Sequence, residues 1–257
     1  MGGAERAERK RKQQAVAVGA VTARPPHGAR RSVVAGVAVL VLLALVVGVG
    51  LWLQHRSDAL PPGIPVAAAG PDYPVTAQGA SVVIGKADAP VTIDVYEDFL
   101  CPACGQFEQL YGDQLEDAVA AGQARVMYHP VAILDAFSAP PGYSTLAAGA
   151  ALCAAEAGVF PRFHDSLFAA QPREGGRGWT SAQLQQLGRD LGAGDDFARC
   201  VRTDHERQVS AATEAARQYL SKLRPDGRLG TPTVLVNGAV VDIGDPGWLD
   251  EALGAAR

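Results

Sequence analysis

The first long apolar segment of the chain runs from Ser32 to Gln54 and contains no charged residue. As a helix rising 1.5 Å per residue it would be roughly 34 Å long, enough to cross a hydrocarbon core of about 30 Å. Residues 1–31 carry eight Lys or Arg and two Glu, without apolar periodicity. We therefore predict a disordered basic tail in the cytoplasm over 1–31 and a transmembrane anchor over 32–54, with the remainder outside the cytoplasm.

A proline-rich segment follows over residues 55–80, with five prolines among glycine and alanine. This composition predicts a semi-extended linker without a core of its own, so the folded domain is expected over 81–257. The small residues at 67–69 are also typical of a signal-peptide cleavage site. They lie well beyond an apolar run that is itself longer than a signal sequence needs, and this favours the uncleaved anchor.

Two cysteines stand where a predicted strand passes into a predicted helix. Apolar residues alternate over 91–96, as in a half-buried strand. After Cys101-Pro102-Ala103-Cys104, apolar residues recur with the spacing of one helix face, at Phe107, Leu110, Tyr111, Leu115, Ala118 and Val119. The free N–H groups and the dipole of a helix N-terminus favour an anion such as a Cys101 thiolate. Cys104 lies one turn later, close enough to attack a mixed disulfide at Cys101.

The remaining pattern predicts one more strand, a helical region and a hairpin. Residues 124–134 read as a strand interrupted at Pro130, because proline cannot donate to a sheet ladder. Residues 143–224 are helical in pattern, and Thr180 with Gln183 forms a capping-box signature. Asn237-Gly238 between two apolar runs predicts a tight hairpin, followed by a short closing helix.

Charge and cysteine count narrow the function. The net charge is −4, and without the +6 of the basic tail residues 32–257 carry −10, so no nucleic-acid partner is expected. A zinc site normally takes four ligands in close pairs, whereas Cys153 and Cys200 stand far apart, and no metal site is predicted. The histidines at 129, 164 and 205 are most simply structural.

The chain resembles DsbA-like thiol–disulfide oxidoreductases, more narrowly their membrane-anchored bacterial members, over about residues 78–255. The resemblance rests on the run from Val95 to Cys104 and on Gly230-Thr231-Pro232-Thr233 before the final hairpin. It implies an α/β thioredoxin-like fold with the helical insertion at about 143–224. It also implies chemistry by the cysteine pair alone, without a cofactor.

The resemblance assigns roles to particular residues. Cys101 is the expected nucleophile and Cys104 the resolving thiol, with Pro102 and Ala103 as the active-site dipeptide. Pro232 is expected to be cis and to face the cysteines, and the backbone of Thr231 to pair with a bound substrate peptide.

Two positions depart from the family pattern. Many thioredoxin-fold enzymes bury an acid six residues before the first cysteine, but Val95 stands there. Glu97 or Asp98 is a candidate proton relay in its place, and both could equally be solvated loop acids. Ala103 replaces the histidine of the strongest oxidants, which suggests a milder oxidant.

Cys153 and Cys200 both fall in the predicted helical insertion. Outside the cytoplasm they are expected to form a structural disulfide. A second redox pair is the rival interpretation, but nothing in the sequence gives either cysteine a reactive setting.

Three functions follow from this pattern. The preferred one is an anchored thiol oxidase that introduces disulfides into exported proteins and is reoxidised by an integral-membrane partner. A reductase of extracytoplasmic disulfides, for example in cytochrome c maturation, uses the same chemistry. A non-catalytic thioredoxin-like binding module, with a merely structural Cys101–Cys104 disulfide, is the third.

Overall fold

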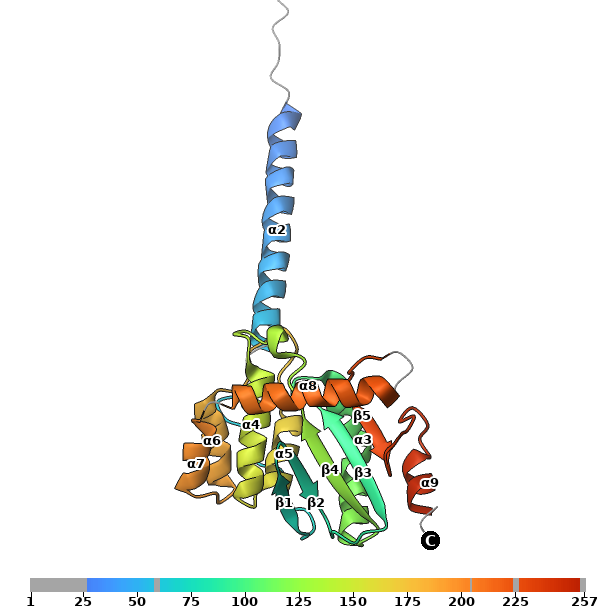
Figure 1. Ribbon diagram of the computed structural model, residues 1–257. Coiled ribbons are helices and arrows are strands. Elements are labelled where there is room, and N and C mark those ends of the chain that lie inside the picture. Colours follow the sequence, from blue (N-terminus) through green and yellow to red (C-terminus); the bar gives the residue numbers. More distant parts are fainter. Residues whose placement is uncertain (1–26, 58–60, 204, 224–226, 255–257) are drawn as a thin grey trace, which may run out of the picture. The chain divides into compact units, whose positions relative to one another are not determined.

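The computed structural model in Figure 1 describes residues 27–57, 61–203, 205–223 and 227–254. The chain divides into two units, Met1–Ser57 and Asp58–Arg257. In the first unit, helix α2 spans His27–Ser57, so the predicted anchor segment is helical. The predicted tail lies outside the described residues as far as residue 26. Among the helices of the described residues, none combines the length and apolar character needed to cross a membrane.

The second unit is built on one six-stranded sheet with the order β1-β2-β4-β3-β5-β6. Only the central neighbours β3 and β4 run parallel, and the other pairs are antiparallel. The strands are β1 Val75–Gln78, β2 Ser81–Ile84, β3 Val91–Glu97, β4 Ala124–Pro130, β5 Thr233–Val236 and β6 Ala239–Val240.

Helices cover this sheet and form the predicted insertion. Figure 1 shows α4 to α7 gathered beside β1 and β2, with α9 beside β5 on the other side. The helices are α3 Pro102–Ala120, α4 Tyr143–Glu156, α5 Phe160–Ala169, α6 Ser181–Asp190, α7 Asp195–Val201, α8 Glu206–Leu223 and α9 Trp248–Gly254, with a 3-10 turn η1 at Asp135–Phe137. The insertion from α4 to α8 therefore matches the predicted range of 143–224.

Local signals in the sequence correspond to local structure. Thr180 and Gln183 form the reciprocal capping box at the start of α6. Asn237 and Gly238 both have positive φ, 49° and 84°, in the turn between β5 and β6. Strand β4 ends at Pro130, the residue expected to interrupt it.

The segment interpreted as a linker is packed against the domain over much of its length, and that part of the interpretation is wrong. Residues Val75–Gln78 form β1 and pair with β2. Ile64 is only 7 % exposed and belongs to the main core, and Ala67 N donates to Ser166 Oγ at 2.9 Å. The prolines hide this packing in the sequence, because residues without a regular period can still fill a surface groove.

Asp98 fixes the chain just after β3, where the sheet leads into the cysteine motif. Its buried carboxylate accepts hydrogen bonds from Leu100 N, from Ile133 N and Leu134 N, and from Ser144 Oγ on α4. A carboxylate that receives four donors ties the segment after β3, the segment after β4 and helix α4 to one point. The loop that carries Cys101 therefore starts from a fixed position.

Candidate active site

Cys101 occupies the N-cap position of α3, and Pro102 fills the first turn. The backbone at Cys101 is extended, with φ −75° and ψ 115°, and its carbonyl accepts from Cys104 N at 3.0 Å. Proline suits this position because the first N–H groups of a helix have no intrahelical partner. Cys101 is 7 % exposed and Cys104 is fully buried, so Cys101 is the more accessible residue of the pair.

The loop before β5 lies against the first cysteine, although 130 residues separate them in the sequence. Cys101 Sγ lies 3.3 Å from the backbone oxygen of Thr231 and donates to it in the thiol form. The Thr231–Pro232 peptide bond is cis, in agreement with the expected geometry. The part of this loop expected to pair with a substrate peptide is thus in contact with the expected nucleophile.

The side chain of Gln171, which follows α5, is hydrogen-bonded to the loop that carries Cys101. Its Nε2 donates to Phe99 O at 3.2 Å and to Cys101 O at 2.8 Å. A Cβ on Gly105 would lie 2.5 Å from Gln171 Oε1, so a larger residue there would displace the end of the Gln171 side chain. Nothing in the sequence pattern singles out Gln171, because its contacts join segments about 70 residues apart.

The two thiols differ sharply in acidity. A hydrogen bond from the Cys104 thiol lowers the pKa of Cys101 to about 6, and the amides of Ala103 and Cys104 contribute, although burial opposes them. Burial raises the pKa of Cys104 well above its ordinary value, and the nearby Cys101 and Glu97 charges add to the effect. At neutral pH the exposed sulfur is therefore a thiolate and the buried one a thiol.

A buried acid–base cluster lies behind the second cysteine. His164 Nε2 contacts both carboxylate oxygens of Glu97, at 3.0 and 3.2 Å, and Nδ1 lies 3.3 Å from Asp165 Oδ1. Burial opposes a charge on His164, but the Glu97 and Glu108 carboxylates outweigh it and raise its pKa well above the ordinary value. Burial also raises the pKa of Glu108 to about 8.

Glu108 connects this cluster to the cysteine motif. It stands one helical turn after Cys104 on α3, so the two side chains share a face. Its Oε1 is buried and has no hydrogen-bond partner among the residues that the structure describes. The cluster therefore holds a proton at neutral pH close to the buried thiol.

The two candidate relay acids differ in their surroundings. Asp98 is occupied by its four donors, and burial raises its pKa to about 6 against their influence. Glu97 instead joins the cluster through His164, which the sequence suggested only as a structural residue. Val95, at the usual position of the acid, is fully buried in the apolar core.

Within the part of the chain that the structure describes, two groups of side chains each bring three metal-ligating atoms within 4.8 Å of one another. In one, Glu97, Glu108 and His164, the ring nitrogen Nε2 is hydrogen-bonded to Glu97. In the other, Cys153, Cys200 and His205, the two sulfurs are bonded to each other. The expectation that the protein uses no metal stays a prediction.

A disulfide joins Cys153 on α4 to Cys200 on α7. It closes a loop with a sequence separation of 47 residues, which is worth roughly 4 kcal/mol in the chain-entropy model. Cys101 and Cys104 are both free thiols in this structure. The four cysteines are thus divided as the sequence analysis expected, into one pair in the insertion and one pair at the start of α3.

Comparison with known proteins places this geometry in a family. Residues 77–253 match the model of the Thioredoxin_4 family, described as thioredoxin. DsbA from Mycobacterium tuberculosis, in its reduced crystal structure, is 28 % identical and superimposes with a TM-score of 0.55, covering 70 % of this chain and all of that one. MdbA from Corynebacterium diphtheriae, a thiol-disulfide oxidoreductase, is 25 % identical with a TM-score of 0.62, covering 72 % and 95 %.

A curated relative shows the same domain in a larger protein. The chain is 32 % identical over 179 residues to the serine/threonine-protein kinase PknE of M. tuberculosis, which is 67 % of this chain but only 31 % of the kinase. The match thus spans about a third of that relative's length. With the cysteine pair at the start of α3 and the facing cis-proline loop, the family match leads to one conclusion. This chain belongs to the thioredoxin family and is a thiol–disulfide oxidoreductase of the DsbA and MdbA type, which works through a redox-active cysteine pair without a cofactor.

Proposed function

We propose that this protein is an extracytoplasmic thiol oxidase that introduces disulfides into exported proteins. The observation that carries the proposal is the position of Cys101 at the N-cap of α3, where the Cys104 thiol and the nearby backbone amides lower its pKa to about 6. A thiolate that is stable at neutral pH stabilises the reduced enzyme, and a stable reduced form makes the disulfide a better oxidant. The absence of a histidine at Ala103 limits this effect and fits an oxidant of moderate strength.

The cycle uses the difference between the two sulfurs. A substrate thiolate attacks Cys101 Sγ of the oxidised pair, the Cys101–Cys104 bond breaks, and the electron pair moves to Cys104, which takes up a proton. A second substrate thiolate then attacks its partner sulfur in the mixed disulfide. The substrate disulfide forms and Cys101 leaves as a thiolate, so two electrons have passed from the substrate to the enzyme.

The buried cluster supplies the proton that Cys104 needs. A thiolate at this fully buried sulfur is unfavourable, and bulk water does not reach it. Glu108 is protonated below about pH 8 and shares a helix face with Cys104, while His164 and Glu97 behind it can restore the proton. We assign the relay to Glu97 acting through His164 and Glu108, and an anchoring role to Asp98.

Attachment to the cell membrane through residues 32–54 is part of the proposal. It is supported by the uncharged run and by the basic residues before it, which favour an N-terminus in the cytoplasm. Exported protein or peptide thiols would then be the substrates, and an integral-membrane protein would reoxidise the cysteine pair.

A reductase is the second candidate, because thiol–disulfide exchange runs in both directions. Its role would be the reduction of extracytoplasmic disulfides, for example in cytochrome c maturation. The low pKa of Cys101 favours the oxidase, since it makes the reduced pair a poor electron donor. The non-catalytic binding module is set aside, because the chain is an oxidoreductase.

The oxidised protein is expected to restore activity to a reduced, unfolded substrate with several disulfides. Cys101→Ser should abolish this oxidation because the attacked sulfur is missing. Cys104→Ser should accumulate mixed disulfides at Cys101 because the resolving thiol is missing. Pre-reduced wild-type protein is the matched control, and equal refolding with Cys101→Ser would contradict the mechanism.

Alkylation of the cysteines in intact cells shows the direction of electron flow. A mostly oxidised Cys101–Cys104 pair supports the oxidase, and a mostly reduced pair supports the reductase.

The alkylation rate of Cys101 in the reduced protein should rise with pH around a midpoint near 6. The sign follows from the lowered pKa, because the reactive thiolate persists down to that pH and is protonated below it. Cys104→Ala removes the main hydrogen bond to the thiolate, so its midpoint should move toward the ordinary cysteine value. Iodoacetamide labelling with mass spectrometry measures both, and a wild-type midpoint above 8 would refute the assignment.

Oxidation of substrate should slow above about pH 8, where Glu108 loses its proton. Glu108→Gln cannot donate a proton and should remove this alkaline limb, with a loss of rate of about tenfold or more. Glu97→Gln removes a negative charge that raises the pKa of Glu108, so the limb should move to lower pH. Glu214→Gln, which alters an exposed acid paired with Arg217 on α8, is the control. Identical pH profiles in all four proteins would contradict the relay.

The full-length protein should remain in the membrane pellet after alkaline carbonate extraction and enter the soluble fraction when residues 1–54 are removed. Protease added to intact spheroplasts should digest the cysteine domain and spare a tag at the N-terminus. Release of the full-length protein by carbonate would contradict the predicted membrane anchor. Protection of the cysteine domain from protease would contradict the predicted orientation.

A further inference from the structure

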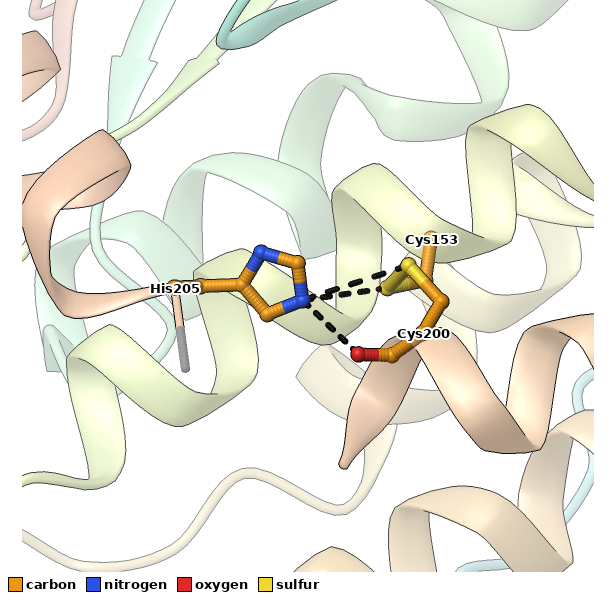
Figure 2. A group of neighbouring side chains, drawn as sticks. All are labelled: Cys153, Cys200 and His205. Atoms are coloured by element: carbon orange, nitrogen blue, oxygen red, sulfur yellow. Dashed lines mark hydrogen bonds between the residues drawn. A yellow bond between two sulfur atoms is a disulfide. The ribbon is translucent and has the colours of Figure 1, made fainter. Parts of the chain in front are cut away.

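The disulfide of the insertion has an imidazole directed at it. Figure 2 shows the His205 ring pointing at both sulfurs and at the Cys200 carbonyl. His205 Nε2 lies 3.4 Å from Cys153 Sγ, 3.9 Å from Cys200 Sγ and 2.9 Å from Cys200 O. Because a carbonyl oxygen only accepts, Nε2 carries a hydrogen, which is shared between the Cys200 carbonyl and the nearer sulfur, that of Cys153. The sequence offered no such partner for either cysteine.

The neighbouring helix leaves room for this ring. A Cβ on Gly149 of α4 would lie 2.7 Å from His205 Cβ and 2.8 Å from its Cγ and Cδ2. Gly149 stands one turn before Cys153, on the same face of α4. The second side of the ring is held by Gln208, whose Oε1 lies 3.4 Å from Nδ1 and whose Nε2 donates to Gly79 O. The imidazole is therefore positioned by three separate segments.

The two sulfurs lie in unequal surroundings. Cys153 is only 1 % exposed and is the sulfur nearer to the His205 N–H. Cys200 is partly exposed, and Glu156 Oε2 lies 4.0 Å from its sulfur. A hydrogen-bond donor stabilises a thiolate on Cys153, while a carboxylate disfavours one on Cys200. The accessible sulfur is thus the one to be attacked, and the buried one is the better leaving group.

We propose that Cys153–Cys200 is a second thiol–disulfide exchange site that accepts electrons from dithiols. A thiolate of the dithiol attacks Cys200 Sγ, the Cys153–Cys200 bond breaks, and the electron pair stays on Cys153 as a thiolate hydrogen-bonded to His205. The second thiol, after losing its proton to solvent, attacks its partner sulfur in the mixed disulfide. The dithiol leaves as a disulfide, Cys200 is released and protonated, and both cysteines are reduced.

The site is tested in the full-length Cys101→Ser/Cys104→Ser protein, where only the second pair can react. Glutathione is added under native conditions, the reaction is quenched with acid, and the adduct is located by mass spectrometry. Glutathione is expected on Cys200, with Cys153 free. Adducts on Cys153, or equal adducts on both residues, would overturn the proposed polarity. Because the first site is silent in this protein, the result does not depend on the oxidase proposal.

Reduction by excess dithiothreitol in the same background measures the role of the imidazole. His205→Ala should slow reduction roughly three- to tenfold, the effect of losing one hydrogen bond to the leaving thiolate. Gly149→Ala should slow it similarly by displacing the ring, although alanine favours the helix. His205→Gln keeps a donor and should recover part of the rate. Glu156→Gln should speed reduction about twofold by removing a repelling charge.

A purely structural disulfide would behave differently in the same assay. Its reduction would occur only through global unfolding, so the rate would rise with urea as the unfolding rate does and would be insensitive to Glu156→Gln. Tryptophan fluorescence follows the fold during the reaction. Reduction that always accompanies loss of the folded signal, or equal rates in wild-type, His205→Ala and Gly149→Ala backgrounds, would overturn the proposal.

Discussion

The stabilisation of one negative charge, on the sulfur of Cys101, is the constraint on which the rest of the structure depends. The sulfur sits at the start of α3, where the backbone amides of Ala103 and Cys104 and the Cys104 thiol can donate to it. These donors act only if the loop is held in place, and buried polar contacts hold it. Asp98 fixes the end of β3, and Gln171 fixes the carbonyls around the cysteine. The sheet order also helps to position the site. Because β5 is the neighbour of β3, the Thr231 loop that precedes β5 lies next to the sulfur.

Burial of the site has a consequence for Cys104, whose thiol needs a source of protons other than bulk water. A thiol without access to water cannot exchange its proton with solvent, and the usual acid is replaced by Val95. In the proposed relay, the cluster of Glu97 at the end of β3, His164 on α5 and Glu108 on α3 meets this need. Three titratable groups in an apolar core are costly unless they share charge and protons. Their presence beside a buried thiol supports the proposed proton relay.

The sequence predicted those features that rest on local signals and missed those that join distant segments. The strand, the cysteine motif and the start of α3 follow from a change of period, and the hairpin follows from Asn237-Gly238. The contact of His164 with Glu97 spans 67 positions, and that of Gln171 with Cys101 spans 70. No period or spacing encodes such pairs. The linker was misjudged for a related reason, since Ile64 is buried by the tertiary packing of an irregular segment.

Comparison of the two cysteine pairs shows what makes a sulfur reactive in this fold. At the start of α3 the accessible sulfur has the donors and the buried sulfur lacks them, so the accessible one leaves readily as a thiolate. In the insertion the order is reversed, because His205 faces the buried Cys153 and Glu156 faces the accessible Cys200. A pair of the first kind releases its product quickly, whereas a pair of the second kind keeps a mixed disulfide on Cys200 until a second thiol arrives. Burial alone makes a disulfide inert, and it is the placement of a donor beside one sulfur that gives exchange a direction.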